Sequence, residues 1–134
     1  MHLFWDTSAV IPLVFQEPHT SRAHRARADG ERALAWSWMR VEAEAALLRR
    51  RAGAEHWREL SKLLSAFMWL QMSPAEESAL CLFNRPLGLR ASDAGHLYVF
   101  SKTTAAISGI QLVTFDQEIK SAAATCSLPL WGKR

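Results

Sequence analysis

Cysteine is scarce in this sequence, and long apolar runs are absent from it. The two cysteines, Cys81 and Cys126, belong to no CxxC pair and to no Cys/His cluster, which argues against a structural zinc site and against a disulfide framework. No apolar stretch approaches the roughly 20 residues that a membrane-spanning helix needs, and the first residues lack the basic and apolar segments of a signal peptide. We therefore expect a protein of the reducing cytoplasm with no membrane attachment.

Several motifs of cofactor and catalytic sites are missing as well. The sequence has no GxGxxG or GxxxxGK[ST] motif for a nucleotide, no HExxH motif for zinc and no GxSxG elbow for acyl hydrolysis. Four of the histidines show no metal-ligand spacing, and we interpret them as surface or core residues: His19, His24, His56 and His96. These absences argue against a nucleotide cofactor and against a serine nucleophile.

Length and composition are those of one globular domain. The chain has 134 residues, 49 % of them hydrophobic and 22 % charged, so we expect residues 1–134 to form a single domain. The net charge of +3 permits a polyanionic partner without requiring one. Ten of the sixteen Lys and Arg residues fall between Arg22 and Lys62. This basic segment is either a phosphate-binding flank or the solvated surface of helices.

Short apolar runs alternate with helical patterns along the chain. Strands are predicted at 3–5, 33–38 and 110–115, and helices at 10–17, 19–29, 39–51, 54–64, 91–104 and 117–124. Residues 67–70 fit either a third strand or the end of the preceding helix, and the capping-box sequence Ser73-Pro74-Ala75-Glu76 predicts a further helix start. The alternation predicts a parallel sheet covered on both faces, which is a three-layer α/β/α sandwich.

The four aspartates occupy two kinds of position. Asp29 lies in a turn, whereas Asp6 and Asp116 each follow a predicted strand and Asp93 begins a helix. Because the carboxyl ends of parallel strands share one edge of the sheet, we expect Asp6 and Asp116 to meet there. Each of the three could instead be a helix N-cap or a first-turn acid. Three such residues together weaken that alternative.

A fourth acid comes from the helix predicted at 39–51. At about 100° per residue, Glu42 shares a face with Trp38 and Met39 that we expect to be buried or nearly so. Burying a carboxylate without a partner is costly, and a metal or another nearby group is the simplest compensation. Glu44 points the other way, toward Arg40, and predicts a surface ion pair.

Converging carboxylates repel one another unless a cation or a proton neutralises them. Mg²⁺ and Mn²⁺ prefer oxygen ligands, and Mg²⁺ takes only one or two carboxylates while keeping several waters. Such ions activate a water for attack on a phosphodiester and stabilise the leaving oxygen. The acids therefore predict metal-dependent phosphodiester hydrolysis.

Four segments contain the four acids: Leu3-Phe4-Trp5-Asp6-Thr7-Ser8-Ala9, Arg40-Val41-Glu42 with Ala46-Leu47, Leu89-Arg90-Ala91-Ser92-Asp93-Ala94-Gly95-His96-Leu97, and Leu112-Val113-Thr114-Phe115-Asp116. They resemble the motifs of the PIN-domain ribonucleases, and most closely those of the VapC toxins of bacterial toxin–antitoxin pairs. The segments follow the order of the family over nearly the whole chain. Gly95 departs from the pattern, because the family more often has a larger apolar residue there.

The resemblance implies a fold, an activity and a site. It implies a parallel sheet of about five strands, Mg²⁺- or Mn²⁺-dependent cleavage of RNA, inhibition by a small cognate antitoxin, and a homodimer in which Trp57 and Trp69 could take part. The implied acidic quartet is Asp6, Glu42, Asp93 and Asp116, with Asp6 and Asp93 as the first choice for direct metal ligands. Supporting hydroxyls are implied at Thr7, Ser8 and Thr114.

Two other functions compete with this one. The first is a non-catalytic PIN-like module that binds RNA or a protein, against which the intact quartet argues. The second is a phosphatase with a strand-end aspartate as nucleophile, which would need a second aspartate where Ser8 stands.

Overall fold

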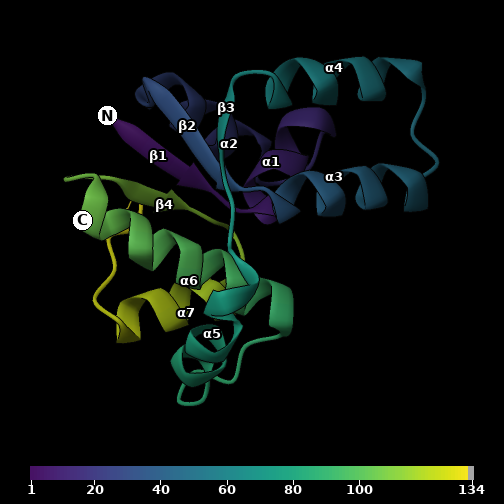
Figure 1. Ribbon diagram of the computed structural model, residues 1–134. Helices are drawn as coiled ribbons and strands as arrows, with labels where there is room; N and C mark the ends of the chain where they lie inside the picture. Colours follow the sequence, from purple (N-terminus) through teal and green to yellow (C-terminus); the bar gives the residue numbers. More distant parts are fainter. Residues whose placement is uncertain (133–134) are drawn as a thin grey trace.

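One parallel sheet organises the molecule. The computed structural model describes residues 1–132. Its sheet has the order β3-β2-β1-β4 (Figure 1), formed by β1 (His2–Trp5), β2 (Arg32–Trp36), β3 (Phe67–Leu70) and β4 (Gln111–Val113). Every neighbouring pair is parallel. Of the five strands expected, four are present, and the fifth position is a single parallel bridge between Leu112 and Leu130.

Helices cover both faces of the sheet, which confirms the three-layer α/β/α sandwich (Figure 1). One face carries α1 (Thr7–Val14), α2 (Thr20–Asp29), α3 (Trp38–Arg49) and α4 (Ala54–Leu64). The other carries α5 (Glu77–Asn84), α6 (Ala91–Ala106) and α7 (Gln117–Thr125), with a short 3-10 turn at Pro74–Glu76 before α5. No helix within residues 1–132 has the length and apolar character to cross a membrane.

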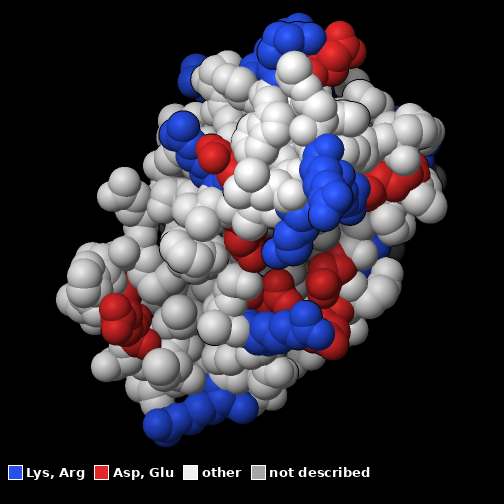
Figure 2. Space-filling view, turned by 90° about the vertical axis from the view of Figure 1, so that its right-hand side faces the viewer, with Lys and Arg blue, Asp and Glu red and all other residues white. Residues whose placement is uncertain are grey.

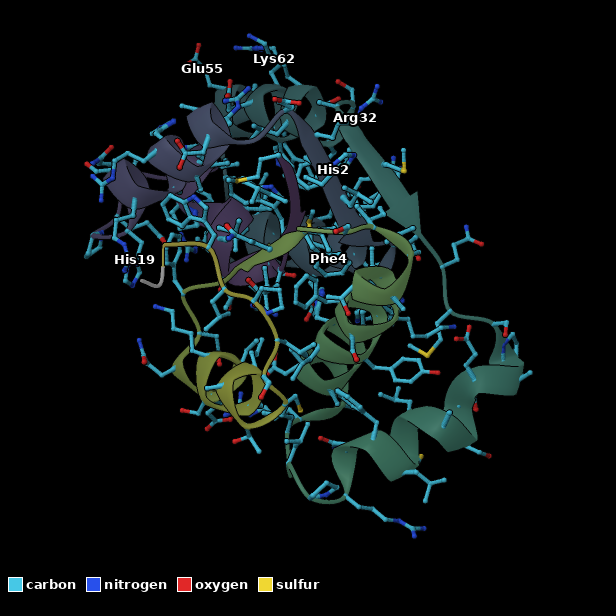
Figure 3. All side chains as sticks on the ribbon, turned by 90° about the vertical axis from the view of Figure 1, so that its left-hand side faces the viewer. His2, Phe4, His19, Arg32, Glu55 and Lys62 are labelled. Carbon is cyan, nitrogen blue, oxygen red and sulfur yellow. The ribbon has the colours of Figure 1, made fainter. Side chains whose placement is uncertain are left out.

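The side chains of β1 point alternately to the two faces of the sheet, and the core is divided into two parts accordingly. Leu3 and Trp5 pack with the helices α1 to α4, whereas Phe4 faces the other side. The Phe4 ring lies 5.4 Å from that of Phe100 in α6, between the sheet and that helix (Figure 3). This two-residue period is that of a strand buried on both faces.

The structure resolves one ambiguity and corrects one expectation. Residues 67–70 form a strand, because Ala33 to Trp36 of β2 pair with them in register. Trp38 was expected on a buried face, and this is wrong: its side chain is 45 % exposed. The strand ends at Trp36, so Trp38 begins α3 at the border of the sheet instead of inside the core. The capping box is confirmed, since the Ser73 amide donates to Glu76 at 2.9 Å.

Candidate active site

The candidate site lies where the sheet changes its direction of growth. From β1 the chain adds β2 and β3 on one side and then returns to place β4 on the other. Asp6 directly follows β1, and Asp116 follows β4 by three residues. The carboxyl ends of two such strands diverge into a crevice, which is where open parallel sheets bind ligands. On this face acidic side chains gather near the middle, with basic side chains above and below them (Figure 2).

Asp6 is buried and accepts hydrogen bonds from two hydroxyls. Its side chain is only 3 % exposed, and Ser8 Oγ donates to one carboxylate oxygen at 2.7 Å while Thr114 Oγ1 donates to the other at 3.0 Å. The amides of Phe115 and Asp116 in turn donate to these hydroxyl oxygens, at 2.9 and 3.2 Å. The backbone after β4 therefore orients both hydroxyl protons toward Asp6.

Burial raises the pKa of Asp6 to about 6, although His96 and the two hydroxyls act in the opposite direction. The loss of hydration destabilises the ionised carboxylate by more than these partners stabilise it. The site thus contains a carboxylate whose ionisation is incompletely compensated by the protein's own groups. A cation would supply the missing compensation.

The carboxylate of Glu42 is held by one hydroxyl and one imidazole. Thr7 Oγ1 donates to Oε1 of Glu42 at 2.8 Å, and His96 Nε2 lies 2.5 Å from the same oxygen. Burial alone would raise the pKa of Glu42, but the hydrogen bonds from His96 and Thr7 outweigh it and hold this pKa below its ordinary value. The expected buried position is right in part, because 26 % of the side chain is exposed.

Asp93 and Asp116 are half-buried and less constrained. Burial raises the pKa of Asp93, and the negative charges of Asp116 and Glu42 raise it further. Asp116 caps α7, with Oδ1 accepting from the amide of Ile119 at 2.9 Å. The structural alternative therefore holds in part: Asp93 is a first-turn acid of α6, and Asp6 occupies the N-cap position of α1, but within residues 1–132 only Asp116 of the three makes a side-chain cap.

The structure brings the four predicted acids to one edge of the sheet. Asp93 interacts through space with Asp116 and Glu42, and Asp6 with Asp116. Across residues 1–132, however, no three His, Cys, Asp or Glu side chains form a ready ligand group. The donor set fits Mg²⁺ or Mn²⁺ nonetheless, because Mg²⁺ needs one or two carboxylates and keeps several waters. The mutual repulsion of the acids is what such an ion would relieve.

Sequence reasoning missed the role of His96. We had interpreted it as a surface or core histidine, and it is indeed buried, with 2 % exposure. It also joins Glu42 across 54 residues, and its Nδ1 is a buried atom without a hydrogen-bond partner among residues 1–132. The available signal was the spacing from Asp93, because residues three apart share a helix face.

Trp36 explains the unusual Gly95. Its ring lies edge-on to His96 at 5.1 Å between centroids, and a Cβ on Gly95 would stand 2.4 Å from the same ring. Glycine thus lets Trp36 pack against α6 beside the site. A cavity of about 760 Å³ opens next to it, lined by Trp36, Trp38, Met72, Arg90 and Ser92 among others.

A family comparison decides the classification. The model of the PIN domain matches residues 3–124. The chain belongs to the PIN domain family. The parallel sheet and the helical layers are those that the resemblance implied.

Two solved structures share the fold of this PIN domain. PAE2754 from Pyrobaculum aerophilum has 26 % sequence identity and a TM-score of 0.63, over 91 % of this chain and 79 % of that one. VapC20 of Mycobacterium tuberculosis, described as a toxin that cleaves the sarcin–ricin loop, has 22 % identity and a TM-score of 0.70, over 90 % and 94 %. None of the curated proteins compared with the chain matches it.

Proposed function

We propose that this PIN domain is a metal-dependent endoribonuclease that hydrolyses phosphodiester bonds of RNA. The observation that carries the proposal is Asp6, a buried carboxylate that two hydroxyls orient beside three further acids. Its pKa of about 6 marks a group whose charge needs an external partner. A merely structural acid would have an ion pair or would not be buried.

Each acid has a defined part in this proposal. Asp6 and Asp93 would hold Mg²⁺ or Mn²⁺ directly, with Glu42 and Asp116 acting through its waters. When bound, the ion supplies an activated water and stabilises the leaving oxygen. Thr7 and His96 both bind Oε1 of Glu42, so Oε2 is left to orient a water. Ser8 and Thr114 fix Asp6 in one rotamer.

A toxin role and its partners complete the proposal. VapC20, which shares the fold, is described as a toxin that cleaves the sarcin–ricin loop. We propose that this chain is likewise the toxin of a pair, acts in the cytoplasm as a homodimer and is inhibited by a small cognate antitoxin. Trp57 and Trp69 are half-buried apolar residues on the α4 and β3 side that could contribute to the dimer.

Asparagine substitutions test the catalytic part directly. Asp6→Asn and Asp93→Asn remove one charge each, and we expect both to lower Mn²⁺-dependent RNA cleavage by about 100-fold or more. Glu44→Gln is the matched control, because it removes one charge from an exposed side chain that pairs with Arg40 and not with the acids of the site. Circular dichroism verifies the fold of each variant. Full cleavage by both Asp6→Asn and Asp93→Asn would rule out the assignment.

The competing binding module predicts a different result. Such a module would bind RNA without cutting it and would not need a cation. Titration calorimetry with Mn²⁺ separates the two functions, and no binding at millimolar Mn²⁺ would favour the module. Co-expression with the neighbouring small reading frame tests the toxin role, since an antitoxin should restore growth and co-purify.

A further inference from the structure

Two cations gather on one aromatic ring beside the acidic site. Phe115 stands between Thr114 and Asp116, and its ring is buried. His19 stacks on this ring at 4.6 Å, with 6° between the two planes. Arg22 Cζ lies 5.2 Å and Lys120 Nζ 5.8 Å from the ring centroid. Residues from α2 and α7 are thus brought together over a residue that follows β4.

These two cations have no carboxylate partner within the described residues 1–132. Burial and the positive charge of Arg22 lower the pKa of Lys120, while Asp6 acts on it in the opposite direction. Like charges held close together destabilise a folded protein unless something of opposite sign joins them. An anion at this position would complete the arrangement with charge-assisted hydrogen bonds.

A cavity receives both side chains. It has a volume of about 370 Å³, and its lining includes Arg22, Lys120, Thr114 and Ser121. Thr114 donates from Oγ1 to Asp6 at 3.0 Å, so one side chain separates the cavity from the buried acid. A group bound here would be a direct neighbour of a group bound at the four acids.

The basic surface continues beyond this cavity. A second cavity of about 580 Å³ shares Arg22 and adds Arg25. Asp29 also lines it, with its carboxylate accepting from Trp131 Nε1 at 2.9 Å. A row of cations that starts at the acids and leads away from them suits a chain of phosphates better than a single small anion.

We propose that Arg22 and Lys120 bind a phosphate of single-stranded RNA next to the phosphodiester that is cut. This inference rests on the proposed function and names a substrate subsite within it. The phosphate would accept from the guanidinium fork of Arg22 and from Lys120 Nζ. Ser121 lines the same cavity and would offer a third donor.

Salt-dependent RNA binding tests the subsite. Fluorescein-labelled twelve-residue oligouridylate is titrated with the protein in EDTA over a range of NaCl, and gel electrophoresis verifies that the RNA stays intact. For single strands each phosphate contact contributes about 0.7 to the slope of log K against log salt. Because both side chains bind the same phosphate, we expect Arg22→Gln/Lys120→Gln to reduce the slope by about 0.7 and to weaken binding about 10-fold at low salt.

Two control proteins isolate the position of the charges. Arg32→Gln/Lys62→Gln removes the same charge from exposed residues. Arg32 begins β2 at the end of the sheet opposite the site, and both residues are seen on the upper margin of Figure 3. Screening limits their effect on RNA at the site, so we expect the slope to be unchanged. The single substitution Arg22→Lys, with Lys120 intact, keeps both positive charges and should therefore leave the slope of the parent protein unchanged.

The outcomes distinguish failure of the subsite from failure of the proposed function. An unchanged slope in Arg22→Gln/Lys120→Gln, with parent protein that cleaves RNA, overturns the subsite alone. Parent protein that binds the oligonucleotide but never cleaves RNA with Mn²⁺ overturns the proposed function. The double variant could instead bind RNA as the parent does and fail to bind an oligoglutamate peptide that the parent binds. That result would assign the cavity to an acidic protein partner and overturn the subsite.

Discussion

The two halves of the candidate site are built differently. Asp6 and Glu42 each contact two side chains that donate or share protons: Ser8 and Thr114 for Asp6, Thr7 and His96 for Glu42. Asp93 and Asp116 are half-buried, and Asp116 uses one oxygen to cap α7. The first pair is fixed before any cation arrives. The second pair retains the freedom to adjust its oxygens to an ion and to its waters.

This difference separates two demands on a metal site. Fixed ligands reduce the reorganisation needed at the moment of reaction, whereas adjustable ligands allow near-octahedral geometry around a small ion. Asp6 is the most buried of the four acids, and its raised pKa shows that it carries the larger electrostatic penalty in the metal-free protein. Substitutions should therefore affect stability unequally even where they affect cleavage alike.

The largest difference in stability is expected at Asp6. Its carboxyl ionises near pH 3.8 in the unfolded chain and near 6 in the folded one, so the metal-free protein loses stability as the pH rises from about 4 to about 6. A shift of this size corresponds to about 3 kcal/mol. Asp6→Asn removes the titration, and we expect it to raise the free energy of unfolding by up to about 3 kcal/mol at pH 7.5 and by nearly nothing at pH 4.

Denaturant unfolding in EDTA at both pH values measures this effect. The Asn amide can be accommodated, because Ser8 Oγ and Thr114 Oγ1 lie 3.3 Å apart and one can donate to the other. Asp93→Asn is the comparison, with a smaller gain because solvent screens that half-buried group. An equal gain at pH 4 and pH 7.5 would show that Asp6 does not titrate as described.

The next largest effect is expected at Gly95, the neighbour of the His96 that contacts Glu42. If helix propensity alone mattered, Gly95→Ala would raise the free energy of unfolding by about 1 kcal/mol. Because the new Cβ would stand 2.4 Å from the Trp36 ring, we expect instead a loss of about 1–2 kcal/mol from overpacking. In a Trp36→Leu background the same substitution should become stabilising. Thermal unfolding of the four proteins decides between the two explanations.

A smaller effect is expected at Thr7. Thr7→Val removes the hydroxyl that donates to Glu42 at 2.8 Å but keeps the shape of the side chain. We expect a loss of about 1 kcal/mol, the usual contribution of one hydrogen bond, and a clear reduction of Mn²⁺-dependent cleavage. Thr125→Val is a control, since this exposed threonine bonds only the backbone of its own helix. Equal cleavage by both variants would remove Thr7 from the support of the site.

The smallest effect is expected at Glu44, the other acid of α3. Its pair with Arg40 spans 3.6 Å between exposed side chains, as the sequence predicted. Exposed pairs four residues apart contribute about 0.3–0.5 kcal/mol. Glu44→Ala should therefore change stability by less than about 0.5 kcal/mol and leave cleavage unaltered. A loss comparable to that of Glu42→Ala would contradict the contrast between the two faces.

Local patterns predicted the parts of the site that depend on strand ends. Asp6 and Asp116 meet because parallel strands share an edge, and that follows from position in the chain alone. The contact between His96 and Glu42 spans 54 residues, and the exposure of Trp38 depends on where β2 stops. Neither has a local signature. Residues 67–70 were ambiguous for the same reason, since only pairing with β2 distinguishes a short apolar strand from a helix end.

Three successive residues after β4 have three separate tasks. Thr114 donates to Asp6, Phe115 carries the two cations on its ring, and Asp116 caps α7. A replacement of one side chain would disturb the task of that residue alone. An inserted or deleted residue would instead shift all three out of place at once. This segment should therefore tolerate changes of side chain far better than changes of length.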